Sequence, residues 1–270
     1  MSYFFDKNMN VIELPEGVTP LEIYVSSIEK DRATSRIEGR NGKIDNGYTF
    51  VERDILIRLM LKGKDRADYQ LLYDEIYNLF GINNHMYVVE PLKPGKRFLV
   101  SIDQRYTPNK LNPYTAIIEI ECSTVELPFA ESIGTSADID RNGILYSQEL
   151  WSYGMGLLHD EESHRYTHNT STFRIFNPGI EVHPFEQQLK ITINNASKDY
   201  QLKNKTTNEI FKVTDDMTGN LILDGANVLN NNLQSLRKTN KQFISIKQGW
   251  NEFEQNGTNE VSFDFRFYYL

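Results

Sequence analysis

Oxygen-bearing side chains recur at alternate positions in one short stretch of the chain. They are Asp138, Asp140 and Asn142, followed by Gly143 and, further on, by Glu149. This is the spacing of a calcium-binding loop, in which a glycine allows the sharp bend and a distant carboxylate completes the ligand set. The flanks oppose it, because Pro128 and Gly134 break any incoming helix. We therefore expect a structural turn here, with a calcium site as the alternative.

Three histidines lie in an acidic stretch that contains Asp160, Glu161 and Glu162. They are His159, His164 and His168. Zinc or iron sites draw on such residue types, but this spacing matches no ligand signature. We expect exposed residues at these positions and no metal site. His183, which precedes Pro184, is expected at the end of a strand.

No set of residues predicts catalysis. Glu119 and Glu121 could act as an acid/base pair on a glycan, but they alternate with isoleucines and so mark the solvent face of a strand. Cys122, the single cysteine, lies on the apolar side of the same strand and is expected to be buried. The chain has neither a glycine-rich phosphate loop nor a Gly-x-Ser-x-Gly motif. We expect a protein that is not an enzyme and has no cofactor.

Charge and hydropathy exclude further classes. The 270 residues carry a formal net charge of −8, with acidic and basic residues mixed along the chain. Sequence-specific binding of nucleic acid requires a clustered basic face, so we do not expect it. No stretch approaches the roughly 18 apolar residues of a bilayer span, and the N-terminus has no secretory signal, so we expect no membrane insertion and synthesis in a cytoplasm.

The first half of the chain predicts a small sheet domain. Residues 44–61 are predicted as one long strand and residues 22–28 as another. The stretch between them, residues 29–43, is charged and contains glycine, which predicts a protruding hairpin or loop and makes this segment a candidate for contact with another subunit. Residues 65–81 predict a helix that covers the sheet, with Asp65 as its N-cap and Gly81 at a left-handed C-terminal position. Shorter strands are expected at residues 87–89, 98–102 and 116–122.

The second half predicts an all-β body. Residues 134–169 are rich in glycine and acidic residues, which is typical of a connector. After residue 170, strand signals recur every ten residues or so, a pattern that favours a β-sandwich or jelly roll. The segments are 173–176, 189–194, 200–202, 209–213, 220–224, 243–246 and 261–269. The last is predicted as one half-buried strand that pairs with earlier strands.

Several short segments follow one another in an order that covers nearly the whole chain. In the first half they are residues 36–40, 47–48, 53–59, 68–80, 94–98 and 127–132. In the second half they are residues 173–179, 184, 189–193, 223–225, 249–251 and 263–267. Their order and spacing resemble the distal tail protein (Dit) family of siphophages, the long-tailed, non-contractile bacteriophages.

The resemblance implies a structural hub of the phage tail tip, or baseplate. It implies a mainly β fold, with an α+β ring-forming domain at residues 1–133, a connector at 134–169 and a galectin-like β-sandwich at 170–270. The first domain would form a homo-hexameric ring that continues the tail tube and lets DNA pass. The implied partners are the tail tube protein, the tail-associated (tail-tip) protein and receptor-binding or other baseplate proteins, and the implied location is the tail tip of the virion.

Four residues are candidates for contacts within the ring. They are Arg36, Arg40, Tyr48 and Arg53, the arginines because a planar guanidinium suits a carboxylate across a subunit boundary. The acidic net charge also suits a channel through which DNA passes. The alternative function is a carbohydrate-binding module that contacts host cell-wall polymer, in which Trp250 stacks on a sugar ring. We expect Trp250 to anchor a turn instead.

Overall fold

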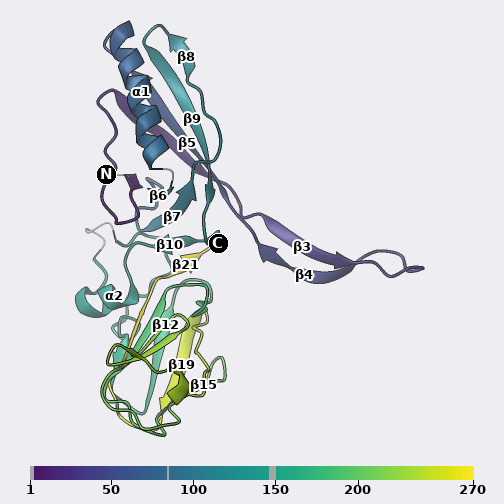
Figure 1. Ribbon diagram of the computed structural model, residues 1–270, viewed down its shortest axis with the longest axis vertical. Helices are drawn as coiled ribbons and strands as arrows, with labels where there is room; N and C mark the ends of the chain where they lie inside the picture. Colours follow the sequence, from purple (N-terminus) through teal and green to yellow (C-terminus); the bar gives the residue numbers. More distant parts are fainter. Residues whose placement is uncertain (1–2, 84, 146–149) are drawn as a thin grey trace. The chain divides into compact units, whose positions relative to one another are not determined.

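Two units divide the chain in the computed structural model, which describes residues 3–83, 85–145 and 150–270. The first unit comprises Met1–Ala130 with Leu270, and the second Glu131–Tyr269 (Figure 1). Residues 134–169, which we predict as a connector, lie within the second unit, and the three-part division stays a prediction. None of the described helices has the length and apolar character needed to span a membrane.

The first unit is an antiparallel sheet with one long helix. Its main path runs β1-β6-β7-β9-β5-β2, and β8 pairs with β9, whereas β3 and β4 form a separate two-stranded sheet. The elements are β1 (Phe4–Phe5), β2 (Val18–Val25), β3 (Lys30–Ser35), β4 (Ile44–Phe50), β5 (Asp54–Lys62), α1 (Arg66–Ile82), β6 (His85–Val89), β7 (Lys96–Ser101), β8 (Asn109–Asn112) and β9 (Thr115–Thr124).

The core of this unit lies between α1 and the sheet. Alternate residues of β5 are buried at 1% exposure or less, because the two-residue period of a strand turns them all toward the helix. Those residues are Ile55, Ile57, Leu59 and Leu61. The facing side of α1 supplies Tyr69, Leu72, Ile76 and Phe80, as its periodicity predicts. Asp65 caps α1 by accepting hydrogen bonds from the backbone N–H groups of Ala67 and Asp68.

Two details of this unit differ from the prediction. The long strand predicted at residues 44–61 is two strands, β4 and β5, because β4 leaves the sheet to pair with β3. Arg53 lies at the junction, where its backbone N–H donates to the hydroxyl of Thr124 and its carbonyl accepts from the backbone N–H of Thr124. The prediction that Gly81 takes a left-handed conformation after the end of α1 is also wrong. Gly81 lies inside the helix, and Asn83 is its C-cap.

The second unit contains a sandwich of two antiparallel sheets. One has the order β11-β20-β13-β16-β17-β18 and the other β12-β19-β14-β15. The elements are β10 (Ala130–Ser132), α2 (Ser136–Asn142), β11 (Thr167–His168), β12 (Thr172–Asn177), β13 (Leu189–Ile193), β14 (Gln201–Asn204), β15 (Glu209–Lys212), β16 (Leu221–Asp224), β17 (Asn227–Asn230), β18 (Leu233–Gln234), η2 (Leu236–Lys238), β19 (Gly249–Gln255), β20 (Val261–Phe265) and β21 (Tyr268–Tyr269). The rings of Phe253 and Phe263 meet between the sheets at 4.9 Å. The mainly β fold class is confirmed.

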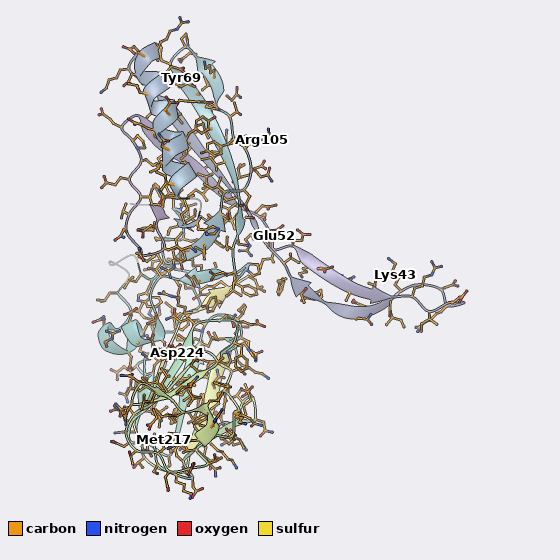
Figure 2. The ribbon with its side chains drawn as sticks, in the orientation of Figure 1. Lys43, Glu52, Tyr69, Arg105, Met217 and Asp224 are labelled. Carbon is orange, nitrogen blue, oxygen red and sulfur yellow. The ribbon has the colours of Figure 1, made fainter. Side chains whose placement is uncertain are left out.

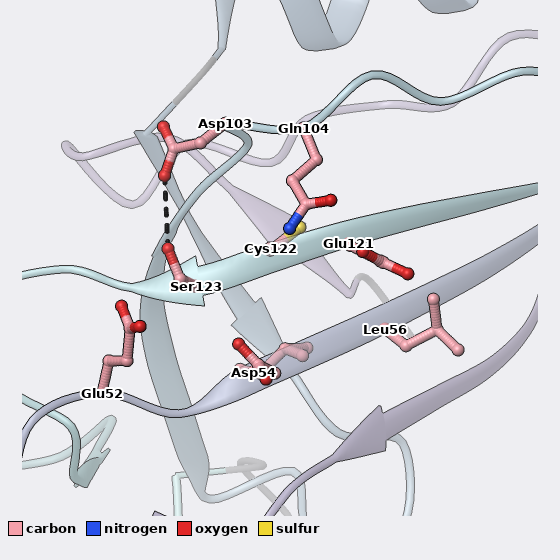
Figure 3. A pocket seen from close by; sticks show the side chains of 9 residues that line it. Glu52, Asp54, Leu56, Asp103, Gln104, Glu121, Cys122 and Ser123 are labelled. Atoms are coloured by element: carbon pink, nitrogen blue, oxygen red, sulfur yellow. Dashed lines mark hydrogen bonds between the residues drawn. The ribbon is translucent and has the colours of Figure 1, made fainter. Parts of the chain in front are cut away.

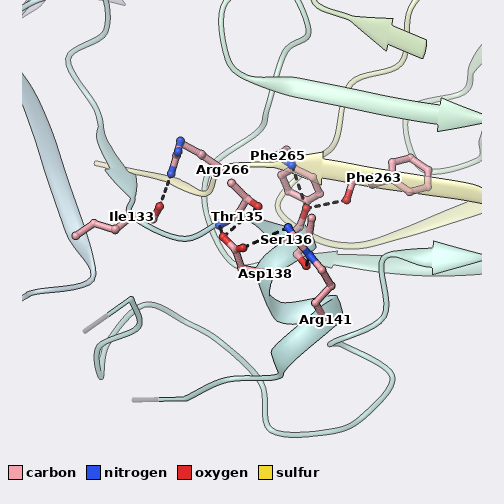
Figure 4. Close-up of polar contacts among 9 residues, drawn as sticks. Ile133, Thr135, Ser136, Asp138, Arg141, Phe263, Phe265 and Arg266 are labelled. Atoms are coloured by element: carbon pink, nitrogen blue, oxygen red, sulfur yellow. Dashed lines mark hydrogen bonds and ion pairs between the residues drawn. The ribbon is translucent and has the colours of Figure 1, made fainter. Parts of the chain in front are cut away.

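Two buried serines cover the edge of the last strands. The hydroxyl of Ser136 donates to the carbonyl of Phe263 at 2.9 Å and accepts from the N–H of Phe265 at 3.0 Å (Figure 4). The hydroxyl of Ser132 accepts from the N–H of Phe267 at 3.0 Å. Because β11 pairs only with the beginning of β20, the side chain of Ser136 takes the place of a neighbouring strand further along.

Several predictions for this unit are wrong in detail. The predicted single final strand is divided into β20 and β21, and Tyr268 is buried. Residues 243–246 form only an isolated bridge, at Ile246, and β19 replaces the turn expected around Trp250. Residues 136–142 form the helix α2 inside the predicted connector.

Candidate assembly interface

The residues of the predicted calcium loop have other roles. Asp138 accepts a hydrogen bond from the backbone N–H of Thr135 at 2.9 Å, which caps α2 at its N-terminus. Asp140 accepts from the backbone N–H of Tyr166 and the hydroxyl of Thr167. Asn142 is the last residue of α2, and Glu149 lies outside the described residues. A helix in place of the loop therefore leaves Asp138 and Asp140 committed to hydrogen bonds within the protein.

The histidines do not converge on a site. His164 contacts the carbonyl of Leu158 at 2.8 Å, and the ring of His168 stacks on that of Phe173 at 4.5 Å. His168 was expected to be exposed, but its ring is partly buried, and this burial lowers its pKa. Within the described ranges, no three histidine, cysteine, aspartate or glutamate side chains are grouped as metal ligands.

Trp250 has a covered ring. The guanidinium of Arg174 lies 4.1 Å from the ring centroid, and Phe176 packs at 5.3 Å. Arg174 is held in turn by two hydrogen bonds to Glu162, of which the one from Nε measures 2.5 Å. A sugar that stacked on this face of Trp250 would have to displace a paired arginine.

The carboxylates of β9 lie on its solvent face, as the alternation predicts. Glu119 pairs with Arg58 at 3.0 Å, and Arg58 also pairs with Glu22 at 2.9 Å. Glu121 is exposed on the same strand. The neighbouring Cys122 is buried, as expected, and burial raises the pKa of its thiol to about 12. This thiol is protonated at neutral pH and is a poor nucleophile.

The hairpin of β3 and β4 has little contact with the rest of the first unit. It pairs Lys30 with Phe50 and Ser35 with Ile44, and all six residues of β3 are exposed. Its few contacts lie near the root, where Lys30 covers the ring of Tyr48 at 4.6 Å and Phe50 packs on Phe129 at 5.7 Å. An isolated two-stranded hairpin is marginally stable in water. Another surface is therefore needed to order it.

Two of the predicted interface arginines lie at the tip of this hairpin, which we define as residues 36–43. Every residue of the tip is exposed. Arg36, Arg40 and Lys43 are its basic residues and Glu38 is its one acidic residue, so its formal charge is +2 (three positive, one negative). Among the described residues, none of the three basic side chains forms an ion pair. Figure 2 shows Lys43 near the outer end of the hairpin and Glu52 near its root.

The other two candidates lie nearer the root. Tyr48 is 50% exposed on β4. Arg53 is only 6% exposed, its guanidinium lies 5.5 Å from the ring of Phe98, and burial lowers its pKa. Its Nε has no hydrogen-bond partner among the described residues. The ring-interface role of all four residues stays a prediction, and the burial of Arg53 makes it the least accessible of them.

Beside the root lies an acidic hollow, which sequence reasoning missed. It has a volume of about 350 Å³ and is lined by four carboxylates, those of Glu52, Asp54, Asp103 and Glu121 (Figure 3). All four residues are exposed, and no lysine or arginine of the described residues pairs with any of them. The solvent-facing positions of Asp54 and Glu121 were predictable from the strand period. The approach of Asp103, from the segment after β7, was not.

Comparison with known proteins shows similarity to phage tail proteins. Residues 7–122 match the family described as phage tail protein RIFT-related domain. No curated protein matches the sequence. In fold the chain is similar to the Dit (gp 19.1) protein of phage SPP1, described as a paradigm of the hub adsorption apparatus in Gram-positive infecting phages. The TM-score is 0.67 at 11% identity, over 98% of both chains.

Two further structures, both of the phage p2 baseplate in its activated conformation, have lower similarity. The structure with Sr has a TM-score of 0.41 at 9% identity, and that with Ca a TM-score of 0.43 at 10% identity. Each match covers 93% of this chain and 90% of the other. The resemblance to phage distal tail proteins is confirmed by the family match together with the fold shared with the SPP1 protein.

Proposed function

We propose that this chain, which carries a phage tail protein RIFT-related domain and has the fold of a phage distal tail protein, is a structural hub of the tail tip. Six copies form a ring that continues the tail tube, and the hairpin of β3 and β4 joins each copy to the next. The sandwich of the second unit anchors receptor-binding or other baseplate proteins. The protein is made in the host cytoplasm and works in the virion.

The single observation that supports this most is the unsupported hairpin. Its strands expose unpaired backbone groups at both outer edges, which natural proteins normally cover. A contact in which one part of a subunit meets a different part of the next is head-to-tail, and such contacts form a ring when the rotation between subunits closes. The hairpin of one copy provides one side of such a contact. The other side is the area around the root of the hairpin on the next copy, which is a different surface of the chain.

The net charge of −8 supports passage of DNA through the ring. A conduit that attracted phosphate would retain the genome, whereas an acidic protein repels it. The tail tube protein and the tail-associated protein are the proposed neighbours above and below the ring.

The test removes the hairpin without disturbing its root. Asp31 and Thr49 are directly paired, so residues 32–48 can be replaced by the two-residue turn Asn-Gly. The shortened chain should keep the circular dichroism of the wild type, because the removed residues are almost all exposed. Light scattering should show a monomer where the wild type forms a ring. An oligomer of unchanged mass would refute the proposed role of the hairpin.

A further inference from the structure

We propose that the tip of the hairpin, residues 36–43, seats in the acidic hollow of the next copy. This inference rests on the proposed ring and names the two surfaces that form each contact in it. The tip is an exposed segment with a formal charge of +2 and no internal ion pairs among the described residues. The hollow presents four exposed carboxylates, which form no ion pair with any lysine or arginine in the described part of the chain. The charges of the tip and of the hollow are therefore complementary.

The shape of the hollow favours a basic segment over a metal ion. Its volume of about 350 Å³ far exceeds that of an ion, and its carboxylates are not grouped as metal ligands. Figure 3 shows Asp54 at the start of β5 with Glu52 just before it, Glu121 on the neighbouring strand β9, and Asp103 on the loop that follows β7. Arginine and lysine side chains, which are long and carry several donors, can reach carboxylates spread in this way.

The lining of the hollow also leaves its acidic groups free for a partner. Asp103 is held by the hydroxyls of Ser101 at 2.8 Å and Ser123 at 3.2 Å, which fix its position without neutralising its charge. Leu56 adds an apolar side chain to the wall, and the tip carries an exposed Ile37. The contact therefore combines ion pairs with a small apolar contribution, as is usual for interfaces between proteins.

The length of the hairpin sets the spacing of the copies that this contact implies. From Lys30 at the root to Gly39 at the tip, the strand geometry spans about 30 Å at roughly 3.3 Å per residue. When the tip of one copy reaches the root of the next, neighbouring roots are separated by that distance. In a regular hexagon the side equals the radius, so the six roots would lie on a circle of about 60 Å diameter.

Charge reversal tests the contact in both directions. The tip variant is Arg36→Glu with Arg40→Glu, which changes the formal charge of the tip from +2 to −2. The hollow variant is Glu52→Arg with Asp54→Arg and Glu121→Arg, which changes the formal charge of the hollow from −4 to +2. Each variant alone places like charges together at every contact, so neither should form rings even at ten times the concentration that assembles the wild type fully. A control variant, Asp74→Arg with Glu75→Arg, reverses two charges at exposed positions of α1 and should assemble as the wild type does.

Mixing the two variants provides the decisive result. A tip with reversed charge matches a hollow with reversed charge, and the remaining tips and hollows are both native. An equal mixture should therefore form rings in which the two variants alternate, which native mass spectrometry would show as three copies of each. Rings formed by either variant alone, or no rings from the mixture, would overturn the inference.

The outcome separates this inference from the proposed function. Loss of rings on hairpin removal, together with rings that tolerate both charge reversals, would leave the hub intact and overturn only the tip-to-hollow contact. A wild-type protein that forms no ring at all would overturn both. Circular dichroism of each variant checks that the fold is retained, and the expected recovery in the mixture cannot come from unfolded chains.

Discussion

Replacing Ser136 with alanine should destabilise the second unit, and the size of the effect follows from the two hydrogen bonds that its hydroxyl makes. The side chain is 0% exposed, and its hydroxyl serves two backbone groups, the carbonyl of Phe263 and the N–H of Phe265. Alanine would leave both groups buried without a partner. An unsatisfied buried polar group costs about 1–3 kcal/mol, so the free energy of unfolding should fall by about 3 kcal/mol in total.

Both tryptophans, Trp151 and Trp250, lie in the second unit, so their fluorescence during urea unfolding reports its stability. The control is Ser197→Ala, at an exposed serine, which should change the free energy of unfolding by less than about 0.5 kcal/mol. A loss of less than about 0.5 kcal/mol for Ser136→Ala would refute the argument that this hydroxyl replaces a neighbouring strand.

Two further predictions concern ionisable groups. Burial lowers the pKa of His168 in the folded state, so the unfolded chain, with an ordinary value of 6.5, takes up the proton first as pH falls. Stability should therefore decrease below about pH 6.5, and melting curves of His168→Phe should depend less on pH; equal dependence would contradict this. The buried Cys122 thiol, with its pKa raised to about 12, should not react with a disulfide reagent near pH 8 until the protein unfolds, and rapid reaction of the native protein would disprove it.

The sequence pattern within a single element was enough to predict α1, the hairpin and the two faces of β9. The stripe of apolar residues and the capping Asp65 predict α1, and the polar stretch between two apolar strands predicts the hairpin. The period of β9 places Glu119 and Glu121 in solvent and Cys122 inside. In each case one face of a single element determines the outcome.

Other features depend on contacts between distant segments. The inward positions of β19 include Asn251 and Gln255, both buried, so the strand lacks the apolar alternation that would reveal it. The amide of Gln255 donates to the carbonyl of the distant Thr170, and that of Asn251 donates to the carbonyl of Lys247. For α2, the capping pair of Thr135 and Asp138 was a usable signal that the calcium-like spacing obscured.

The acidic hollow is formed partly by residues whose exposure follows from a local pattern and partly by a residue from a distant segment. Asp54 and Glu121 occupy solvent-facing strand positions that the sequence indicates. Their proximity to Asp103 depends on the chain segment after β7, whose course no local pattern reveals. A functional surface of this kind therefore emerges only when the tertiary structure brings separate segments together.

The central claim is that copies of this chain complete one another's exposed hairpins around a central opening. Electron microscopy of the purified full-length protein tests it most directly. The account predicts ring-shaped particles with six subunits. Single particles of one subunit, at high protein concentration and also in the presence of the adjoining tail proteins, would contradict it.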